Sequence, residues 1–570
     1  MTDSNLVGNA VVAQSNSQYI SIVPENGEQF NPGQKIVYNI EPEVGFVKKD
    51  SYLVFDVLNN SIDESRYCLQ KNIGAHALIE RVDIFSKETG VLLESNTHYA
   101  QWCNIEKQYL MDSHTSGQNY EGVGEPVQSW THQVSAANVA TSSRSIPSPA
   151  EIANNNLSPV TTDGDGGLPA YTSRRFCIPL KAGLFCAYGG EEKAVPVLAF
   201  GGLRIEITLA KARMTLQDLG WRYKDTDLQG KDRDAFFDWR SGNVITDGLA
   251  DNNTANNFID VKITPGGNKF FTNDLQDVGL CVGNQMLVTN IDEAAGANRQ
   301  NQTYIGHVTN ITGSDVAART INGVTSNFFN TITIRIAGNT PGFNGIAAGA
   351  IVTKRGVPNY KIMGTEFRLL QLVPSPQVAD AMTKGINYEF NSYDVFFDNI
   401  PTTALRHQVP IHSVASKALA TFTMLMDTSN DEGQVASAAD FFTGSLPNAI
   451  NLNDVVYFIN NRLYPLRSYN PQNKGDKVLA TNELVKAWRA LGKQPMCLGN
   501  ADYGDMENYT NTPLIARELA RNNMVFDLRN AEPELRLSFS AGRANVLRVH
   551  TFVFSKKIVQ TTATGVQVIH

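Results

Sequence analysis

A basic and aromatic segment near residue 460 has residue types that could bind nucleic acid. Arg462, Tyr464, Arg467 and Tyr469 follow one another closely in RLYPLRSYNP. Arginine neutralises phosphate and tyrosine rings stack on bases, but both residue types are also enriched at protein–protein contacts. Only two cations are clustered here, next to prolines, in a chain of net charge −8. We therefore predict that this segment packs on its own domain and contacts a neighbouring subunit.

Other residues that could bind a metal or catalyse a reaction lack the required spacing. Asp163 and Asp165 in TTDGDGG match only the beginning of a calcium loop, because the later glutamate of that loop is missing. His407 and His412 are five residues apart in an extended segment, which places them on opposite faces. The sequence has no serine-nucleophile elbow and no phosphate-binding lysine loop. We assign no catalytic, cofactor-binding or metal-binding residue and expect no cofactor.

The composition favours a β-rich protein with large buried surfaces. The chain has 570 residues, 44 Gly, 23 Pro and only 18% charged residues. Its net charge of −8 argues against a protein whose whole surface binds the phosphate groups of nucleic acid. The first residues lack the layout of a secretory signal, and no apolar run reaches the roughly 20 residues of a membrane span. The six cysteines form no close pairs, which predicts reduced thiols.

Short segments of alternating polarity predict strands in both halves of the chain. In the first half they include KIVYNI, SYLVFDVL, the hairpin IERVDIFSKETGVLLE and LRIEITL. Helical spacing and capping residues predict helices in HYAQWCNIEKQYL, in TNELVKAWRALG after Thr481, and in TPLIARELARNN after Thr512. The order of strands and helices recurs in the second half, which predicts two similar β-sandwiches.

Changes in periodicity predict the domain boundaries. Residues 1–25 are predicted to be a flexible N-terminal arm, residues 26–383 the first domain and residues 384–570 the second. Two polar stretches of the first domain, at about 111–173 and 211–355, are predicted to be long loop insertions. Stretches of this length in a compact protein are usually functional or exposed.

Three stretches resemble the double jelly-roll major capsid proteins of eukaryotic double-stranded DNA viruses. They are HALIERVDIFSKETGVLLE (His76–Glu94), the segment from CIPLKAGLFCAYGG to LRIEITL (Cys177–Leu209) and YFINNRLYPLRSYNP (Tyr457–Pro471). The resemblance is to the virophage and polinton-like virus type, and more distantly to algal large DNA viruses and adenovirus hexon. It implies an all-β fold of two tandem eight-stranded antiparallel jelly rolls, with short helices and long loop insertions.

The same resemblance implies a structural function without enzyme activity. Three chains would form a homotrimeric, pseudo-hexameric capsomer, and capsomers would assemble into an icosahedral virus shell. The implied partners are further copies of the chain, penton proteins and minor capsid or cement proteins. Whether an internal lipid layer is also a partner is a question that the resemblance leaves open. The implied location is the virion, assembled inside the host cell, without sequence-specific binding of nucleic acid.

A second interpretation stays open, namely a β-sandwich protein that binds carbohydrate or a glycosidase. The long loops would then form its site, and its paired carboxylates could lie far apart in the sequence. Five tryptophans in 570 residues do not favour a surface on which sugars stack. The capsid interpretation predicts a trimer, whereas the carbohydrate interpretation predicts a monomer or a small oligomer.

Overall fold

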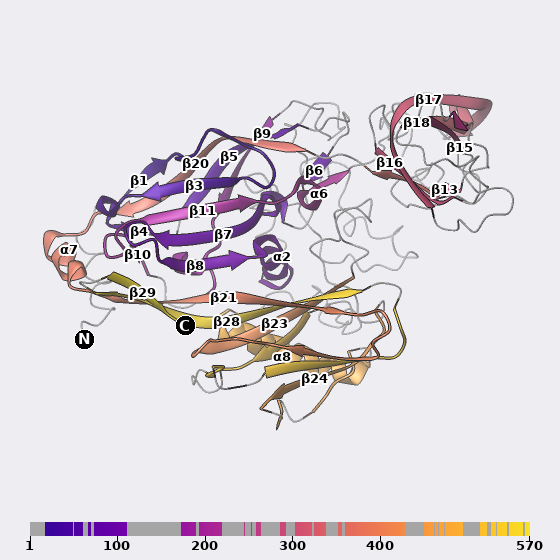
Figure 1. Cartoon of the computed structure of the whole chain (residues 1–570). Helices are drawn as coiled ribbons and strands as arrows, with labels where there is room; N and C mark the ends of the chain where they lie inside the picture. The colour runs from indigo at the N-terminus through magenta and orange to yellow at the C-terminus, as the bar shows by residue number, and fades with distance from the viewer. Residues whose placement is uncertain are drawn as a thin grey trace.

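The computed structural model consists of two β-sandwiches that are stacked on one another and linked by the helix α7 (Pro376–Thr383) (Figure 1). The first sandwich precedes α7 and the second follows it. Each has an apolar core between its two sheets. The structure describes residues 17–49, 51–60, 67–69, 73–110, 173–189, 193–218, 244–245, 252–253, 258–263, 285–291, 302–321, 324–337, 351–355, 359–427, 450–460, 462–464, 467–471, 473–493, 514–520, 526–529, 531, 533–543, 546–562 and 565–570.

The first sandwich consists of a seven-stranded and a four-stranded sheet. The larger sheet has the order β10-β4-β20-β5-β9, and β1 and β2 also pair with β20. The smaller sheet has the order β3-β11-β7-β8. The elements are β1 (Ser17–Ile22), β2 (Gln29–Phe30), β3 (Lys35–Ile40), η1 (Pro42–Val44), β4 (Phe46–Val47), β5 (Tyr52–Asn59), η2 (Gly74–Leu78), β7 (Ile79–Ser86), β8 (Leu92–Thr97), α2 (Tyr99–Leu110), β9 (Ser173–Pro179), η3 (Gly183–Phe185), β10 (Val195–Pro196), β11 (Leu203–Leu209) and β20 (Tyr360–Leu372).

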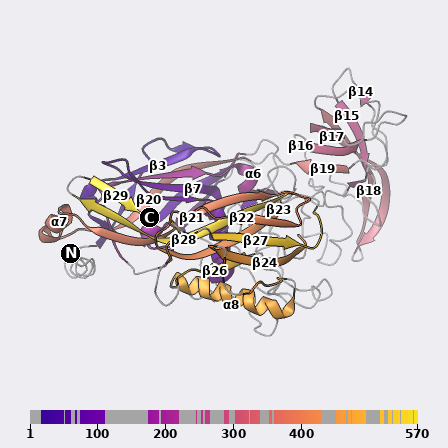
Figure 2. The ribbon, with the colours of Figure 1, turned by 60° about the horizontal axis from the view of Figure 1, so that its bottom comes forward.

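The second sandwich has a five-stranded and a four-stranded sheet. One sheet has the order β21-β28-β23-β26, with β29 paired to β28, and the other has the order β22-β27-β24-β25. The helix α8 lies beside β26 (Figure 2). The elements are β21 (Asn387–Ile400), β22 (Arg406–Pro410), β23 (Ala418–Asp427), β24 (Leu452–Ile459), β25 (Arg462–Leu463), α8 (Lys474–Ala490), β26 (Leu514–Glu518), β27 (Pro533–Phe539), β28 (Leu547–Thr562) and β29 (Gly565–Ile569).

Both sandwiches have the strand order of a jelly roll. When the main strands are ranked along the chain, ranks one, eight, three and six form one sheet, and ranks two, seven, four and five form the other. In the first sandwich the ranked strands are β1, β3, β5, β7, β8, β9, β11 and β20. In the second they are β21 to β28 in sequence. The predicted fold class, all-β with two tandem jelly rolls, is confirmed.

The described part of the second predicted insertion, at about 211–355, lies at one end of the molecule. The segment between β11 and β20 contains α6 (Ala212–Thr215) and β12 (Leu216–Asp218), and β12 pairs with β6 (Tyr67–Leu69) from the connection between β5 and β7. The segment then forms a separate seven-stranded sheet, which Figures 1 and 2 place at the end opposite α7. Its strands are β13 (Val244–Ile245), β14 (Asn252–Asn253), β15 (Phe258–Ile263), β16 (Gln285–Ile291), β17 (Gln302–Ile321), β18 (Val324–Ala337) and β19 (Ile351–Arg355).

Alternation in the sequence determines which face of a strand is buried. In β11, Leu203, Ile205 and Ile207 are buried in the first core, whereas Arg204 between them is exposed. The turn between β7 and β8 contains Gly90, whose φ of 69° lies in the left-handed region that glycine adopts without strain. The predicted hairpin and the predicted helix in HYAQWCNIEKQYL, which is α2, are both present.

Three predictions of local structure are wrong. The segment TPLIARELARNN contains strand β26 and not a helix after Thr512, because pairing with β23 outweighs its helix propensity. Helix α8 begins at Lys474, before the predicted cap Thr481. Ser17–Ile22, in the predicted flexible arm 1–25, form β1 on the edge of β20. The earlier residues of that arm, and the predicted calcium-loop fragment, lie outside the described residues.

Candidate functional site: the junction between the two jelly rolls

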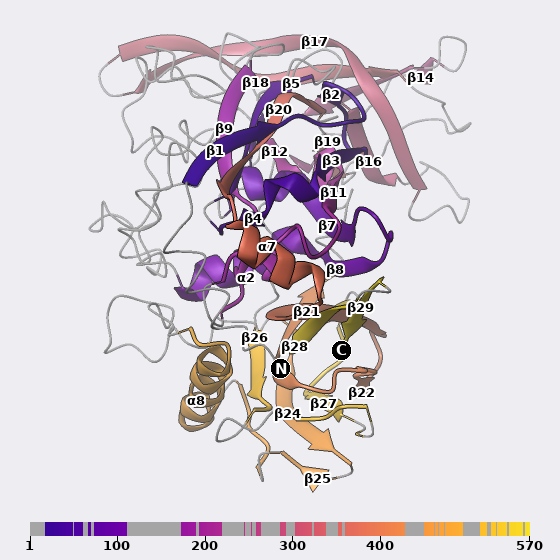
Figure 3. The ribbon, with the colours of Figure 1, turned by 90° about the vertical axis from the view of Figure 1, so that its left-hand side faces the viewer.

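An aromatic cluster joins the two jelly rolls at a contact surface that we call the junction. Trp102 of α2 is 1% exposed and lies on the outer face of the sheet β21-β28-β23-β26. The centroid of its ring is 4.4 Å from that of Phe554, 5.4 Å from that of Phe422 and 5.5 Å from that of Trp488. Figure 3 shows α2 between the two jelly rolls. Because the other face of this sheet forms the second core, the sheet is packed on both faces.

A buried carboxylate, that of Glu94 on β8, connects the two jelly rolls by hydrogen bonds. It accepts hydrogen bonds from the backbone N–H groups of Gly183 (2.8 Å) and Leu184 (2.7 Å) in η3. It also accepts them from the hydroxyl of Ser392 on β21 (2.8 Å) and the side-chain amide of Asn96 (3.0 Å). Burial raises the pKa of Glu94, and the hydrogen bonds limit that rise. Glu94 therefore fixes η3 of the first jelly roll against β21 of the second.

Replacing Glu94 by glutamine is expected to destabilise the folded chain by about 1–3 kcal/mol. One of the two carboxylate oxygens would become an NH2 group, which donates hydrogen bonds and does not accept them. The buried backbone N–H of Gly183 or Leu184 would therefore lose its acceptor. The free energy of unfolding in urea would measure the effect. Glu80→Gln, at an exposed position on β7, is the matched control and should change stability by less than about 0.5 kcal/mol. Equal stabilities of the two variants would contradict the role of Glu94.

Backbone contacts at the junction leave no room for side chains at two glycines. A Cβ atom at Gly183 would lie 1.9 Å from the carbonyl oxygen of Asn391, and one at Gly189 would lie 1.7 Å from that of Leu491. The Tyr388 hydroxyl also donates a hydrogen bond of 2.9 Å across the junction to the Leu184 carbonyl oxygen. Such close approach is typical of a domain core and not of a mobile contact. The backbones of the two jelly rolls therefore pack directly on each other at these positions.

A buried ion cluster lies at the edge of the junction. The carboxylate of Glu106 on α2 lies 3.1 Å from Nζ of Lys181 and also pairs with Lys493, which follows α8. Lys493 donates a further hydrogen bond of 2.7 Å to the carbonyl oxygen of Ala187. Burial alone would raise the pKa of Glu106, but attraction to the two lysines outweighs it and lowers the pKa to about 2. Glu106 is therefore ionised, and it joins α2 to the end of α8.

Two histidines, the buried His550 and the half-buried His98, face each other across the junction. The rings of His98 and of His550 on β28 have centroids 4.6 Å apart. Nδ1 of His550 lies 2.7 Å from Oε1 of Gln101, so this nitrogen carries the proton. Burial, together with repulsion from His98 and Arg548, lowers the pKa of His550 to about 3. Burial and Arg548 also lower the pKa of His98, so both imidazoles are neutral near pH 7.

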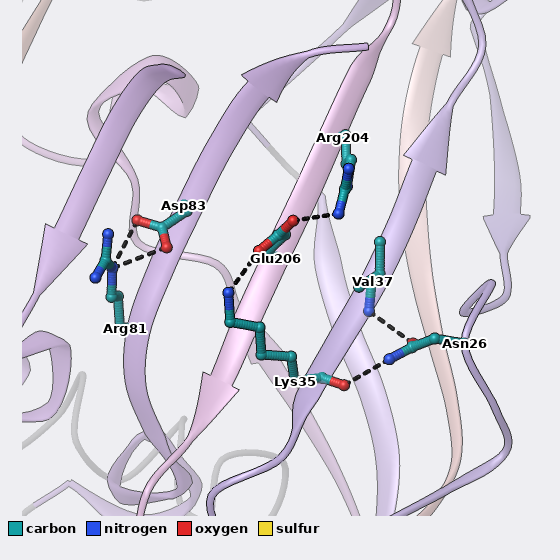
Figure 4. A network of polar contacts seen from close by, with 7 residues as sticks. All are labelled: Asn26, Lys35, Val37, Arg81, Asp83, Arg204 and Glu206. Atoms are coloured by element: carbon teal, nitrogen blue, oxygen red, sulfur yellow. Dashed lines mark hydrogen bonds and ion pairs between the residues drawn. The ribbon is translucent and has the colours of Figure 1, made fainter. Parts of the chain in front are cut away.

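Two carboxylates on the outer face of the sheet β3-β11-β7 form a pair of the kind that a glycosidase uses. Glu206 and Asp83 lie opposite each other on β11 and β7. Figure 4 shows that Glu206 pairs with Lys35 (2.8 Å) and Arg204 (2.5 Å), and that Asp83 pairs with Arg81 (2.8 Å). Burial alone would raise the pKa of Glu206, but the two cations lower it. A glycosidase needs an acid of raised pKa, so this network does not favour the carbohydrate interpretation.

The structure divides the predicted subunit-contact segment into exposed and buried parts. Arg462 and Arg467 are exposed, and Arg467 forms an ion pair with Asp476 (3.3 Å). Tyr464 is half-buried against the second core, and Tyr469 is buried within it. Its side chain is therefore not available to a neighbouring subunit. The contact role of the exposed residues stays a prediction.

Among the described residues, no group of three or more histidine, cysteine, aspartate and glutamate side chains could hold a metal ion. Cys103, Cys177 and Cys186, which belong to the described residues, are not joined in disulfide bonds. The helices that the structure describes include none that is long and apolar enough to cross a membrane. Within the part of the chain that the structure describes, we therefore take the junction as the candidate functional site.

The strand order and the junction define a double jelly-roll protein. No protein-family model and no curated protein matches the sequence. Among solved structures, the chain is similar to the Faustovirus major capsid protein, with 9% identity over 96% of this chain and 90% of the other and a TM-score of 0.49. It is similar to the PBCV-1 virus capsid with 8% identity over 98% of this chain and 97% of the other and a TM-score of 0.44. It is similar to the mavirus major capsid protein with 10% identity over 97% of this chain and 90% of the other and a TM-score of 0.35. The description of the fold rests on the strand order given above.

Proposed function

We propose that this chain is the major capsid protein of a double-stranded DNA virus and has a structural, non-enzymatic role. The observation that carries the proposal is the repetition of one jelly roll, in the same strand order, within a single chain. Two similar lobes in each of three chains would give a pseudo-hexameric ring, which can occupy the six-fold positions of an icosahedral shell. The low charge of the chain suits the burial of large lateral surfaces between such rings.

The proposal implies several partners and a location. Further copies of the chain would form a homotrimeric capsomer and then the lateral contacts of the shell. Penton proteins and minor capsid or cement proteins would fill the positions that a trimer cannot occupy, and an internal lipid layer is a further candidate partner. The chain would be part of the virion, assembled inside the host cell, and would not read a nucleic-acid sequence.

The oligomeric state of the purified full chain tests the proposal. We expect a particle of three times the chain mass of 62.5 kDa by light scattering coupled to size exclusion. Electron microscopy of the same sample should show rings of six similar lobes. A chain that stays monomeric at the highest soluble concentration would overturn the proposal.

A further inference from the structure

The beginning of α2 is attached to the second jelly roll on both sides of His98. Just before it, the carbonyl oxygen of Thr97 accepts a hydrogen bond of 3.2 Å from the Tyr393 hydroxyl. One turn after it, Trp102 lies in the aromatic cluster of the junction, and its backbone N–H donates a hydrogen bond of 3.1 Å to the carbonyl oxygen of His98. We call residues 98–102 the first turn of α2. A force on the ring of His98 therefore acts directly on this turn.

Two features make the first turn of α2 easier to detach than the rest of the junction. His98 has a φ of 54°, in the left-handed region, which costs a residue with a side chain about 1–2 kcal/mol. Nε2 of His550 is buried and has no hydrogen-bond partner among the described residues. Detachment releases the strain at His98 and lets water reach this nitrogen, and both changes lower the free-energy cost of opening.

The charged side chain that acts on both histidine rings is a cation. Burial is the largest cause of the lowered pKa of each imidazole, and the guanidinium group of Arg548 lowers both pKa values further. Repulsion from His98 also lowers the pKa of His550. No carboxylate of the described residues acts on the pKa of either ring. Proton uptake by either ring therefore places a second positive charge beside Arg548 without a negative charge to offset it.

The other elements packed around the two rings present neutral side chains to them. On the strands beside β28, Phe397 of β21 and Met424 of β23 lie opposite His550, and neither side chain titrates. On α2, Gln101 forms a hydrogen bond with His550 and raises the pKa of His98, but its amide group carries no charge. A response to acid at this place therefore comes from the two histidines.

The carboxylates of the junction keep it closed in mild acid. Burial raises the pKa of Glu106, near the far end of α2, but attraction to Lys181 and Lys493 outweighs it and lowers the pKa to about 2. The ion cluster at this end of α2 therefore persists while imidazoles take up protons. Burial raises the pKa of Glu94 on β8, so acid removes no stability through this carboxyl group.

We infer that His98, His550 and Arg548 form an acid-sensitive latch between the two jelly rolls. When either imidazole takes up a proton, the first turn of α2 leaves β28, while the far end of α2 and the cores of both jelly rolls stay in place. The pKa of His550 is lowered from 6.5 to about 3, so the stability of the closed latch is present above pH 6.5 and is lost as the pH falls from 6.5 toward 3. This inference goes beyond the proposed function and does not depend on it.

Oxidation of a buried methionine tests whether the latch opens. Met426 on β23 is 3% exposed, and its Sδ lies 3.5 Å from Nε2 of Gln101 in the first turn of α2. Hydrogen peroxide oxidises an accessible methionine to the sulfoxide, which mass spectrometry of peptides detects. Between about pH 7 and about pH 4.5, the lowered pKa of His550 raises the open fraction by about 100-fold, and the oxidation rate of Met426 in the full chain should rise with it. Met382, which is 1% exposed beside α7, reports unfolding elsewhere and should keep its rate.

Histidine variants assign the response to the latch. The double variant His98→Gln with His550→Asn gains no charge in acid at either position, so its Met426 oxidation rate should change less than about threefold over the same pH range. His98→Gln alone should show an intermediate rise, and it provides the test if near-ultraviolet circular dichroism finds the double variant unfolded. His407→Gln is the matched control, because His407 pairs with Asp398 at 2.9 Å and acts on neither ring. It should keep the full response.

Three results would overturn the latch. The first is a Met426 oxidation rate in the unmodified chain that is equally slow at both pH values. The second is a full response in the histidine variants. The third is a rate for Met382 that rises together with that of Met426, because the whole chain would then unfold. None of these results concerns the oligomeric state at neutral pH, which tests the proposed function separately.

Discussion

Replacing Glu106 by glutamine is expected to lower the free energy of unfolding by about 3–5 kcal/mol. The change leaves the ammonium groups of Lys181 and Lys493, whose side chains are 12% and 19% exposed, beside a neutral amide. The pKa of Glu106, lowered to about 2 from 4.5, supports a similar size, since each pKa unit corresponds to about 1.4 kcal/mol. A lower urea midpoint at an unchanged slope would measure this loss.

An exposed ion pair provides the control for Glu106. Asp380 and Lys384 pair at 2.9 Å at the end of α7. The side chain of Asp380 is 69% exposed and that of Lys384 is 72% exposed. Asp380→Asn should therefore cost less than about 0.5 kcal/mol. Adding Lys493→Met to Glu106→Gln should recover part of the stability, because one unpaired ammonium group is removed. A loss below about 1 kcal/mol for Glu106→Gln would contradict a buried ion cluster.

Acid is expected to weaken the folded chain through the histidines of the junction. His550 has its pKa lowered from 6.5 to about 3, so the folded state favours the neutral imidazole. The stability that this provides is present above pH 6.5 and is lost as the pH falls from 6.5 toward 3. The loss is about 1.4 kcal/mol per pH unit, or about 2 to 3 kcal/mol by pH 4.5. His98 contributes in the same direction, and the raised pKa of Glu94 opposes it.

Comparison with His550→Asn isolates the histidine from these other groups. The asparagine amide can donate to Gln101 as Nδ1 does, but it gains no charge in acid. Urea unfolding from about pH 7 to about pH 4.5 should therefore show a smaller loss of stability for the variant than for the unmodified chain. Parallel pH dependences of the two proteins would contradict the assignment of a neutral, buried His550.

Strand alternation and hairpin turns made most of the first jelly roll predictable. The pattern in LRIEITL identified the buried face of β11, and Gly90 identified the turn between β7 and β8. Local preference failed at β26, where LIARE has a helical composition but pairs with β23 and places Arg517 inside the protein. Whether this segment forms a helix or a strand depends on its pairing with β23, which lies about ninety residues away in the sequence. No local pattern contains that information.

The junction could not be predicted from the sequence. Glu94, Trp102, Ser392 and His550 meet there, although nothing in the spacing of these residues links them. A charged residue in an otherwise uncharged strand, such as Glu94 in LLESNT, is the nearest thing to a signal. For the predicted contact segment, the sequence identified residue types suited to a contact. Only the structure separates the buried Tyr469 from the exposed Arg462.

The sheet β21-β28-β23-β26 serves two cores at once, and this restricts how the chain can evolve. A substitution on β28 must satisfy the jelly roll to which the strand belongs, and also the helix of the other jelly roll that lies on it. Neither lobe can therefore be exchanged for a homologous one without matching changes in its neighbour. Among the described strands, those of the sheet β13–β19 at the far end pair only with one another, so the length and sequence of this sheet are less restricted than those of the two lobes.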